Sequence, residues 1–385
     1  MIELQKWRPA AGRQVRVGVV STYPPTRCGI ARFTHSLVES VEEDDDTVSF
    51  DVVRLVGEPA SDGECGYPVT MEFDPGSHVG LKAAAAHLNR RDAAVISHEF
   101  GIFGSEDGSS VVELVDMLEV PAITILHTVL PSPSGRQREI IERLAEATTP
   151  VVLCAAARDI LTSNYDVPVD RVEVIPHGAS WGPQPVNHPP RRRLITWGLI
   201  GPGKNLEQAI AAVAELDHLD PQLRYQIVGR LHPAYVRSHG YAYRSELSRL
   251  VFDLGLEDRI EFIDRYVDDA ELLSMVRRAD LVLVPYGNSD QVSSGVITEA
   301  IGAGRPIVST RFPYAEEVLA SGAGIVVDHD PSSLAAGVHQ LLDDTVSYRR
   351  AARSASQQSG DLSWANVGRR YARLLHQIAP SRATA

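Results

Sequence analysis

Short apolar runs alternate with segments of helical periodicity twice along the chain, and this alternation restricts the possible fold more than any other feature. The runs are too continuous for half-exposed antiparallel strands, so they predict buried parallel strands. The first set is VRVGVV (15–20), FDVVRLV (50–56), AAVIS (93–97), AITIL (122–126), VVLCAA (151–156) and VEVI (172–175). The second set is LITWGLI, RYQIVG, IEFID, LVLVPY, PIVST and GIVV, between positions 194 and 327.

A Pro-rich polar stretch, WGPQPVNHPPRRR (181–193), separates the two sets and is typical of a linker. The 385 residues are too many for one typical core. The sequence therefore predicts an α/β protein with two doubly wound Rossmann-like domains facing a cleft. The expected boundaries are 1–185, 186–360 and a closing helix in 361–385, with Trp364, Tyr371, Leu374 and Leu375 on one side.

Charge and composition exclude several classes of function. The net charge is −13, and residues 1–185 hold 15 Lys and Arg against 27 Asp and Glu. This acidic half disfavours nucleic acid and strong binding to anionic membranes. No apolar run approaches the ~20 residues that span a bilayer, and MIELQKWRPAAGRQ has no signal region, so a cytoplasmic protein is expected. Cys28, Cys65 and Cys154 are odd in number and widely spaced, against a disulfide framework or zinc site. The run EEDDD (42–46) is expected to be a solvated loop.

The segment QVSSGVITEAIGAGRPIVST (291–310) carries the strongest functional signal. It follows the predicted strand in ADLVLVPY, at the carboxyl end where open parallel sheets bind ligands. Ser294, Gly295 and Val296 start a helix whose free amides favour a phosphate. Glu299 follows one turn later, with no Ser or Thr three positions earlier to form a capping box. It is interpreted as a ligand for hydroxyl groups, the alternative being a surface Glu on an ordinary crossover helix.

The segment GLIGPGKN (198–205) satisfies the P-loop pattern G-x-x-x-x-G-K between a strand and a helix. A P-loop needs Ser or Thr next to hold Mg²⁺, whereas this chain has Asn205. The strand LVLVPY ends in Tyr286 rather than in an acidic residue. These departures disfavour a P-loop NTPase, and the acidic residues predict no metal site.

Four residues of the first half follow predicted strands. Gly29 would let the backbone approach a ligand without an intervening side chain, although such glycines are also common for conformational reasons. His127 should point into the cleft, although a lone His is more often a structural donor. His98 and Glu99 end another strand and are candidates for the acceptor side.

The 291–310 block resembles the donor-site signature of family 4 glycosyltransferases, which have the two-Rossmann-domain GT-B architecture. The family pattern is a Glu, seven intervening residues and a second Glu. Glu299 matches the second, and Gln291 replaces the first, which keeps a carbonyl acceptor and loses the charge. The resemblance implies a retaining, metal-independent and cofactor-free hexosyltransferase. It would use a GDP- or UDP-linked sugar as donor and a hydroxyl acceptor, expected to be soluble.

The resemblance also implies roles for single residues. Glu299 would hold the nucleotide ribose, while Gln291 and His127 would orient the sugar. Lys204 matches a family Lys that neutralises the leaving diphosphate, and Leu199 stands where the family has an Arg. The remaining matches are Gly29 facing the diphosphate, Tyr266 near the base, Arg230 as a replacement charge with a surface Arg as its alternative, and His177 as a structural residue.

Two other functions stay open from the sequence. A catalytically weak or dead relative, acting as a sugar-nucleotide sensor or a partner subunit, would explain Leu199 and Gln291, which both remove family charges. A two-lobed binding protein would share the architecture. It would not need Lys204 and Glu299 at strand ends.

Overall fold

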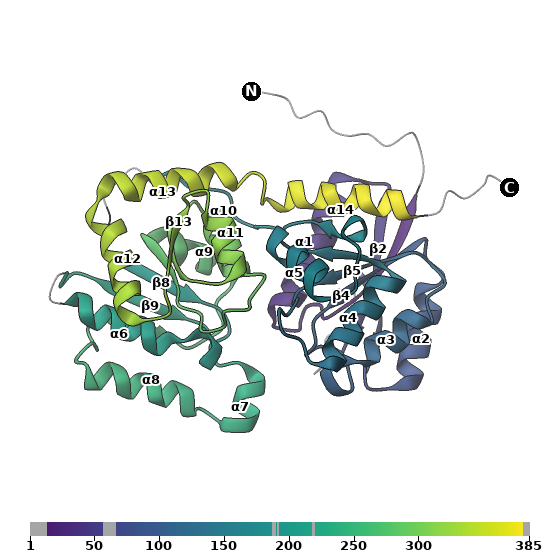
Figure 1. Ribbon diagram of the computed structural model, residues 1–385, viewed down its shortest axis with the longest axis horizontal. Helices are drawn as coiled ribbons and strands as arrows, with labels where there is room; N and C mark the ends of the chain where they lie inside the picture. Colours follow the sequence, from purple (N-terminus) through teal and green to yellow (C-terminus); the bar gives the residue numbers. More distant parts are fainter. Residues whose placement is uncertain (1–13, 57–66, 187–189, 191, 218–219, 380–385) are drawn as a thin grey trace. The chain divides into compact units, whose positions relative to one another are not determined.

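The computed structural model describes residues 14–56, 67–186, 190, 192–217 and 220–379. The chain divides into two compact units. Unit 1 contains residues 1–153, 158–176 and 364–385, and unit 2 contains residues 154–157 and 177–363. Each unit is a parallel sheet with helices around it (Figure 1). Cys65 lies outside the described residues.

Unit 1 has a seven-stranded sheet in the order β3-β2-β1-β4-β5-β6-β7, and every pairing is parallel. Its strands are β1 (Val15–Ser21), β2 (Val48–Leu55), β3 (Val69–Phe73), β4 (Ala93–His98), β5 (Ala122–Leu126), β6 (Thr149–Val152) and β7 (Glu173–Val174). Its helices are α1 (Gly29–Asp44), α2 (His78–Leu88), α3 (Ser110–Asp116), α4 (Gly135–Ala147), most of α5 (Ala155–Asn164), and α14 (Trp364–Ile378).

Unit 2 has a six-stranded parallel sheet in the order β10-β9-β8-β11-β12-β13. Its strands are β8 (Arg193–Trp197), β9 (Arg224–Val228), β10 (Ile260–Ile263), β11 (Leu281–Val284), β12 (Ile307–Thr310) and β13 (Gly324–Val327). Its helices are α6 (Leu206–Asp217), α7 (Pro233–His239), α8 (Ala242–Asp253), α9 (Asp269–Arg278), α10 (Gly295–Gly302), α11 (Pro313–Leu319), α12 (Pro331–Asp343) and α13 (Thr345–Gln358).

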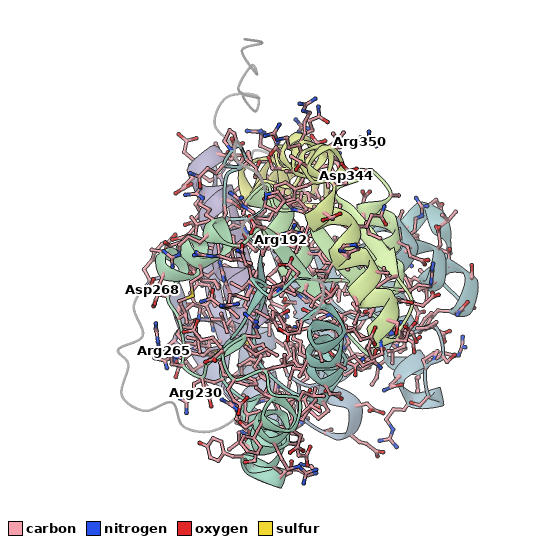
Figure 2. The ribbon with its side chains drawn as sticks, turned by 90° about the vertical axis from the view of Figure 1, so that its left-hand side faces the viewer. Arg192, Arg230, Arg265, Asp268, Asp344 and Arg350 are labelled. Atoms are coloured by element: carbon pink, nitrogen blue, oxygen red, sulfur yellow. The ribbon has the colours of Figure 1, made fainter. Side chains whose placement is uncertain are left out.

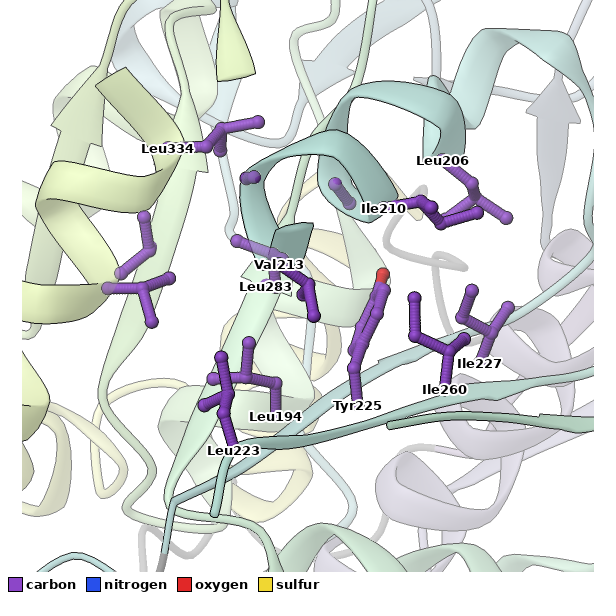
Figure 3. Close-up of a cluster of buried hydrophobic side chains, with 14 of the residues drawn as sticks. Leu194, Leu206, Ile210, Val213, Leu223, Tyr225, Ile227, Ile260, Leu283 and Leu334 are labelled. Carbon is purple, nitrogen blue, oxygen red and sulfur yellow. The ribbon is translucent and has the colours of Figure 1, made fainter. Parts of the chain in front are cut away.

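The core of unit 2 forms where α6 packs on the sheet. Leu206, Ile210 and Val213 lie on one side of α6, at the spacing of successive helical turns. They pack against a layer of strand side chains that includes Tyr225 of β9 and Leu283 of β11 (Figure 3). Because both faces of this sheet are covered by helices, the strands need continuous apolar runs, as the sequence predicts.

The last helix, α14, completes the core of unit 1. It packs along α1, and its apolar side fills the same cluster as the first strands (Figure 1). Trp364, Tyr371, Leu374 and Leu375 are all buried, so the prediction of one apolar side is confirmed. The ring centroid of Trp364 lies 5.1 Å from that of Phe33 in an edge-to-face arrangement.

The prediction of a solvated loop at EEDDD is wrong for the secondary structure and for Asp45, although Glu43, Asp44 and Asp46 are exposed. Glu42, Glu43 and Asp44 belong to the last turn of α1, and Asp45 is 5% exposed. The Oδ2 atom of Asp45 lies 2.9 Å from Nε2 of His376 on α14, and its Oδ1 accepts from the Thr47 hydroxyl at 2.6 Å. Burial raises the pKa of Asp45, but the hydrogen bonds with Thr47 and His376 together outweigh it, so the net shift of the pKa is downward. The acidic run is therefore partly an anchor for α14.

The predicted strands differ from the strands of the structure at two places. The sequence reading omits β3, whose residues VTMEF alternate in polarity because β3 is the half-exposed edge strand. It also extends the strand in VVLCAA to residue 156, whereas the corresponding strand, β6, ends at Val152. Ala155 instead starts α5, and the Cys154 sulfur accepts from the Ala157 amide at 3.3 Å. An apolar run with alanines is compatible with both a strand and a helix start. The contact between Cys154 and the Ala157 amide, which marks the helix start, is not visible in the sequence.

Candidate functional site

The predicted donor residues of unit 2 follow four adjacent strands at one edge of its sheet. Tyr266 follows β10, Arg230 follows β9, Lys204 follows β8, and the 291–299 segment follows β11. From β8 the chain continues to β9 and β10 on one side of the sheet, and from β11 it continues to β12 and β13 on the other side. The topological switch point therefore lies between β8 and β11. Open α/β sheets bind ligands outside the carboxyl ends of strands at this point. The sequence pattern and the topology therefore indicate the same edge.

Two loops meet at the switch point. The Gly287 amide, after β11, donates to the Gly203 carbonyl in the β8–α6 loop at 3.2 Å. Lys204 donates from Nζ to the Tyr286 hydroxyl, and Nζ lies 3.9 Å from the centroid of the Tyr286 ring. Within the described residues, no carboxylate forms an ion pair with Lys204. The lysine thus keeps an uncompensated positive charge at the predicted diphosphate site.

The backbone around this loop is closely packed. The Gly198 amide donates to the Val228 carbonyl at 3.0 Å, which brings the ends of β8 and β9 together. Gly229 has φ +131°, and a Cβ there would lie 2.0 Å from the Gly198 oxygen, so only glycine fits. Arg230 is exposed at this edge (Figure 2) and forms no ion pair with a described residue.

The start of α10 has the features of an anion site. The Ser294 hydroxyl caps the helix by accepting from the Ile297 amide at 3.3 Å. Among the described residues, the amides of Gly295 and Val296 have no acceptor. His177, interpreted as structural from the sequence, lies beside this helix start. Its Nε2 is 3.4 Å from the position of a Cβ at Gly295.

Glu299 has a protein partner that the sequence does not reveal. Its side chain is buried, and its Oε2 accepts from the Ser180 amide at 3.0 Å. One turn along α10, a Cβ at Gly302 would lie 2.6 Å from Cβ of Ala179 and 2.8 Å from the Trp181 oxygen. Residues 179–181 therefore pack directly on α10. The carboxylate holds this segment in place, and its role toward a ribose stays a prediction.

Gln291 and Tyr266 are the outer members of the predicted donor site. The Gln291 amide nitrogen donates to the Ser293 carbonyl at 2.6 Å, which folds the side chain back on its own loop. The backbone carbonyl of Gln291 accepts from the backbone amide of Tyr314 at 3.4 Å. Tyr266 is 53% exposed in the segment that leads to α9. Both roles in ligand binding stay predictions.

Unit 1 has its own switch point between β1 and β4. Gly29 follows β1 as the first residue of α1, after the cap residue Cys28, whose sulfur accepts from the Ala31 amide at 3.4 Å. A Cβ at Gly29 would have no heavy atom within 4 Å. Neither a crowded neighbour nor a positive φ explains this glycine, so the conformational explanation loses its support.

His98 differs from the expectation for an acceptor-side residue. It is completely buried, between Phe100 and Phe103, with ring centroids 5.1 and 6.1 Å away. Both ring nitrogens lack a hydrogen-bond partner among the described residues. Burial lowers its pKa from 6.5 to about 3, so the ring is neutral. A side chain without exposed surface cannot contact an acceptor, and we assign His98 to the core of unit 1.

Glu99 and His127 lie next to this core. Glu99 accepts from the Thr128 hydroxyl and from the Phe100 amide, and burial raises its pKa against the opposing effect of these bonds. Nε2 of His127 lies 2.8 Å from the Ser97 hydroxyl, and its ring packs edge-to-face on Phe33. His127 is 9% exposed. The structure thus gives His127 a fixed orientation, and its contact with a donor sugar stays a prediction.

Within the described ranges, no three His, Cys, Asp or Glu side chains gather in a metal-binding arrangement. The metal-independent and cofactor-free character stays a prediction. None of the helices in the described part of the chain is both long enough and apolar enough to cross a membrane.

Sequence reasoning missed Tyr286 and Ser180, which contact Lys204 and Glu299. Tyr286 ends the predicted strand LVLVPY, so its place at the switch point was available from the sequence. Its contact with Lys204 depends on a hydrogen bond across 82 positions. Ser180 participates through its backbone amide, which leaves no trace in residue type.

Comparisons with known proteins agree with this geometry. Residues 183–358 match the family described as glycosyl transferases group 1. A D-inositol 3-phosphate glycosyltransferase of Corynebacterium efficiens is 27% identical over 279 residues, which cover 65% of this chain and 64% of the relative. One of Kineococcus radiotolerans is 28% identical over 326 residues, which cover 74% and 71%. The alignments with the Corynebacterium relatives span a little under two thirds of those proteins.

Solved structures resemble the fold over nearly the whole chain. Sucrose-phosphate synthase from Thermosynechococcus elongatus has a TM-score of 0.73 at 16% identity and covers 95% of this chain and 99% of its own. Anabaena HepE in complex with UDP and glucose has a TM-score of 0.73 at 16% identity, with 94% and 100% covered. At this identity the likeness supports the fold alone, which is the GT-B architecture predicted from the sequence.

Proposed function

We propose that this chain, whose residues 183–358 match the group 1 glycosyl transferases, moves a hexose from a nucleotide diphosphate sugar to a hydroxyl acceptor. The observation that carries the proposal is the edge of unit 2 at its switch point. An uncompensated Lys204 and the free amides of α10 lie after β8 and β11, the two strands that flank it. Both features favour a phosphate-bearing ligand.

These groups suit the departure of a nucleoside diphosphate. When the bond between the sugar and the diphosphate breaks, negative charge develops on the leaving phosphate oxygen. Lys204 and the amides of Gly295 and Val296 stabilise this charge, because they are held in place before the reaction starts. Glu299 binds the ribose hydroxyls, and Gln291 orients the sugar.

We propose retention of configuration at the transferred sugar. In this mechanism, the acceptor attacks from the face on which the diphosphate leaves, and a phosphate oxygen takes the acceptor proton. No carboxylate nucleophile is required. Gln291 fits this mechanism because it offers hydrogen bonds to sugar hydroxyls without a formal charge.

Relatives indicate which substrates to test first. Several are named D-inositol 3-phosphate glycosyltransferase, and HepE was solved with UDP and glucose. UDP-glucose and GDP-linked hexoses are therefore the first donors, and inositol 3-phosphate is the first acceptor. We propose that the acceptor is soluble, since residues 1–185 carry a net charge of −12.

The test is a donor panel with nucleotide release as the readout. The wild type should release UDP or GDP from one donor when the acceptor is present. Lys204→Ala should lower turnover by about 100-fold or more, as for the loss of one preorganised charge-stabilising group. Gln291→Glu should retain or raise activity. Calorimetry should show that both variants stay folded and that Lys204→Ala also binds the donor more weakly.

One result would replace the enzyme with a sensor. The wild type would bind a nucleotide sugar, release nothing from any donor, and gain turnover only when Leu199→Arg and Gln291→Glu are combined. These two positions lack the charges that the resemblance leads us to expect.

A further inference from the structure

We propose that Tyr286 is a positioning residue that holds the Lys204 ammonium at the phosphate-binding edge without neutralising it. The contact itself is independent of the proposed function, and its consequence for a nucleoside diphosphate rests on that function. Tyr286 follows β11 and Lys204 follows β8, so the pair spans the switch point.

Tyr286 is rigidly placed. It is 3% exposed, and its ring stacks on Phe312 with centroids 5.8 Å apart and planes 13° apart. Its carbonyl accepts from the Thr310 hydroxyl at 2.7 Å, which joins the end of β11 to β12. The aromatic ring is thus fixed by both stacking and backbone contacts.

The lysine, in contrast, has a flexible four-carbon stem. Its Nζ lies 3.9 Å from the centroid of the Tyr286 ring and donates to the ring's hydroxyl. Nζ also lies 3.7 Å from the position of a Cβ at Gly198. The ammonium therefore sits over the glycine-containing β8–α6 loop, where a larger side chain at position 198 would crowd it.

The chemical type of the partner matters. A carboxylate would hold the ammonium equally well but would cancel the charge that an anion needs. A tyrosine attracts the cation through the ring face and one oxygen lone pair and carries no formal charge itself. Because the lysine side chain is already ordered in the free protein, it loses less conformational entropy when a phosphate binds. Tyr286 acts on the ligand through Lys204.

The first experiment measures the contact without a nucleotide. The sequence contains three lysines, and Lys82 is exposed on α2 as an internal reference. Trace acetylation followed by mass spectrometry gives the reaction rate of each. Lys204 should react more slowly than Lys82, and Tyr286→Phe should raise its rate at least about threefold by removing the acceptor for its proton. An unchanged rate in Tyr286→Phe overturns the proposal.

Tyr225→Phe is the matched control. Tyr225 is another buried tyrosine of unit 2, and its hydroxyl donates to Thr196 at 2.8 Å. Its loss should leave the Lys204 rate unchanged. A Lys204 rate that rises equally in both variants would indicate general loosening of unit 2 and would also overturn the proposal.

The second experiment separates phosphate binding from base binding. Tyr286→Phe should weaken the binding of UDP about tenfold, as expected for the loss of one charge-assisted contact. The affinity for uridine, which has no phosphate, should stay unchanged. In the Lys204→Met background, Tyr286→Phe should have no further effect on UDP. A persistent effect there would mean that Tyr286 contacts the ligand itself, and the positioning role would be wrong. If the wild type binds no nucleotide, the proposed function fails. The acetylation rates still show whether Tyr286 holds the Lys204 ammonium.

Discussion

The buried His98 should make the stability of unit 1 depend on pH. Its ring has no exposed surface and no hydrogen-bond partner among the described residues, and its pKa is about 3 instead of 6.5. Because the folded-state pKa is lower than the unfolded one, the unfolded chain binds more protons between these values. Stability is therefore fully present above pH 6.5 and falls as the pH falls toward 3.

The size of the effect follows from the shift. Each pH unit below 6.5 costs about 1.4 kcal/mol while the folded ring stays neutral. At about pH 4.5, two units lower, the wild type should have lost about 3 kcal/mol of unfolding free energy through His98 alone. His98→Leu removes the titrating group and breaks no side-chain hydrogen bond of the ring. It should be near neutral at pH 7 and more stable than the wild type at about pH 4.5.

Urea unfolding at several pH values measures these free energies, and hydrogen exchange of β4 and β5 peptides assigns them to unit 1. His339→Leu, at an exposed position on α12, is the control and should follow the wild type. Parallel loss of stability in the wild type and His98→Leu between pH 6.5 and 4.5 would refute the reasoning. It would mean that the ring accepts a proton in the folded state.

Three further outcomes test the site. Glu299→Ala should weaken nucleotide binding and also destabilise the protein by about 1–3 kcal/mol, because the Ser180 amide loses its acceptor. Glu299→Gln should retain stability and still lower the affinity for the nucleotide. Calorimetry measures the affinity, and thermal unfolding measures the stability of each variant. Gly29→Ala should leave stability equal or slightly higher, since its methyl has no neighbour within 4 Å, while donor turnover falls; unchanged turnover would remove Gly29 from the site. Nucleotide release should continue in excess EDTA, and restoration of lost activity by Mg²⁺ or Mn²⁺ would contradict a metal-independent reaction.

The fold was predictable because its main determinants are local in the sequence. Continuous apolar runs identified every strand of unit 2 and the inner strands of unit 1. Asp268 caps α9 by accepting from the Glu271 amide, three residues later, at 2.8 Å. Signals of this kind depend on residues within one turn or strand. The edge strand β3 lacks them because it buries only part of its surface.

The errors arise where distant residues decide the outcome. Asp45 is buried because His376, 331 positions later, pairs with it. His98 ends a strand as a site residue would, but Phe100 and Phe103 enclose its ring. Glu299 has no capping partner within its own helix turn, and the backbone amide that it binds lies 119 positions earlier. Residue type and spacing do not encode such contacts.

The division of the chain has a consequence for its synthesis. Unit 1 needs α14, since Trp364, Tyr371 and Leu375 fill its core, yet the 187 residues from His177 to Ser363 come first. At about 5–20 residues per second, the ribosome takes roughly 10–40 s to make that intervening stretch. During this time, the nascent first unit exposes the apolar side of α1 that α14 later covers. Unit 2 ends at Ser363, so its whole sequence is made before the α14 residues that unit 1 needs.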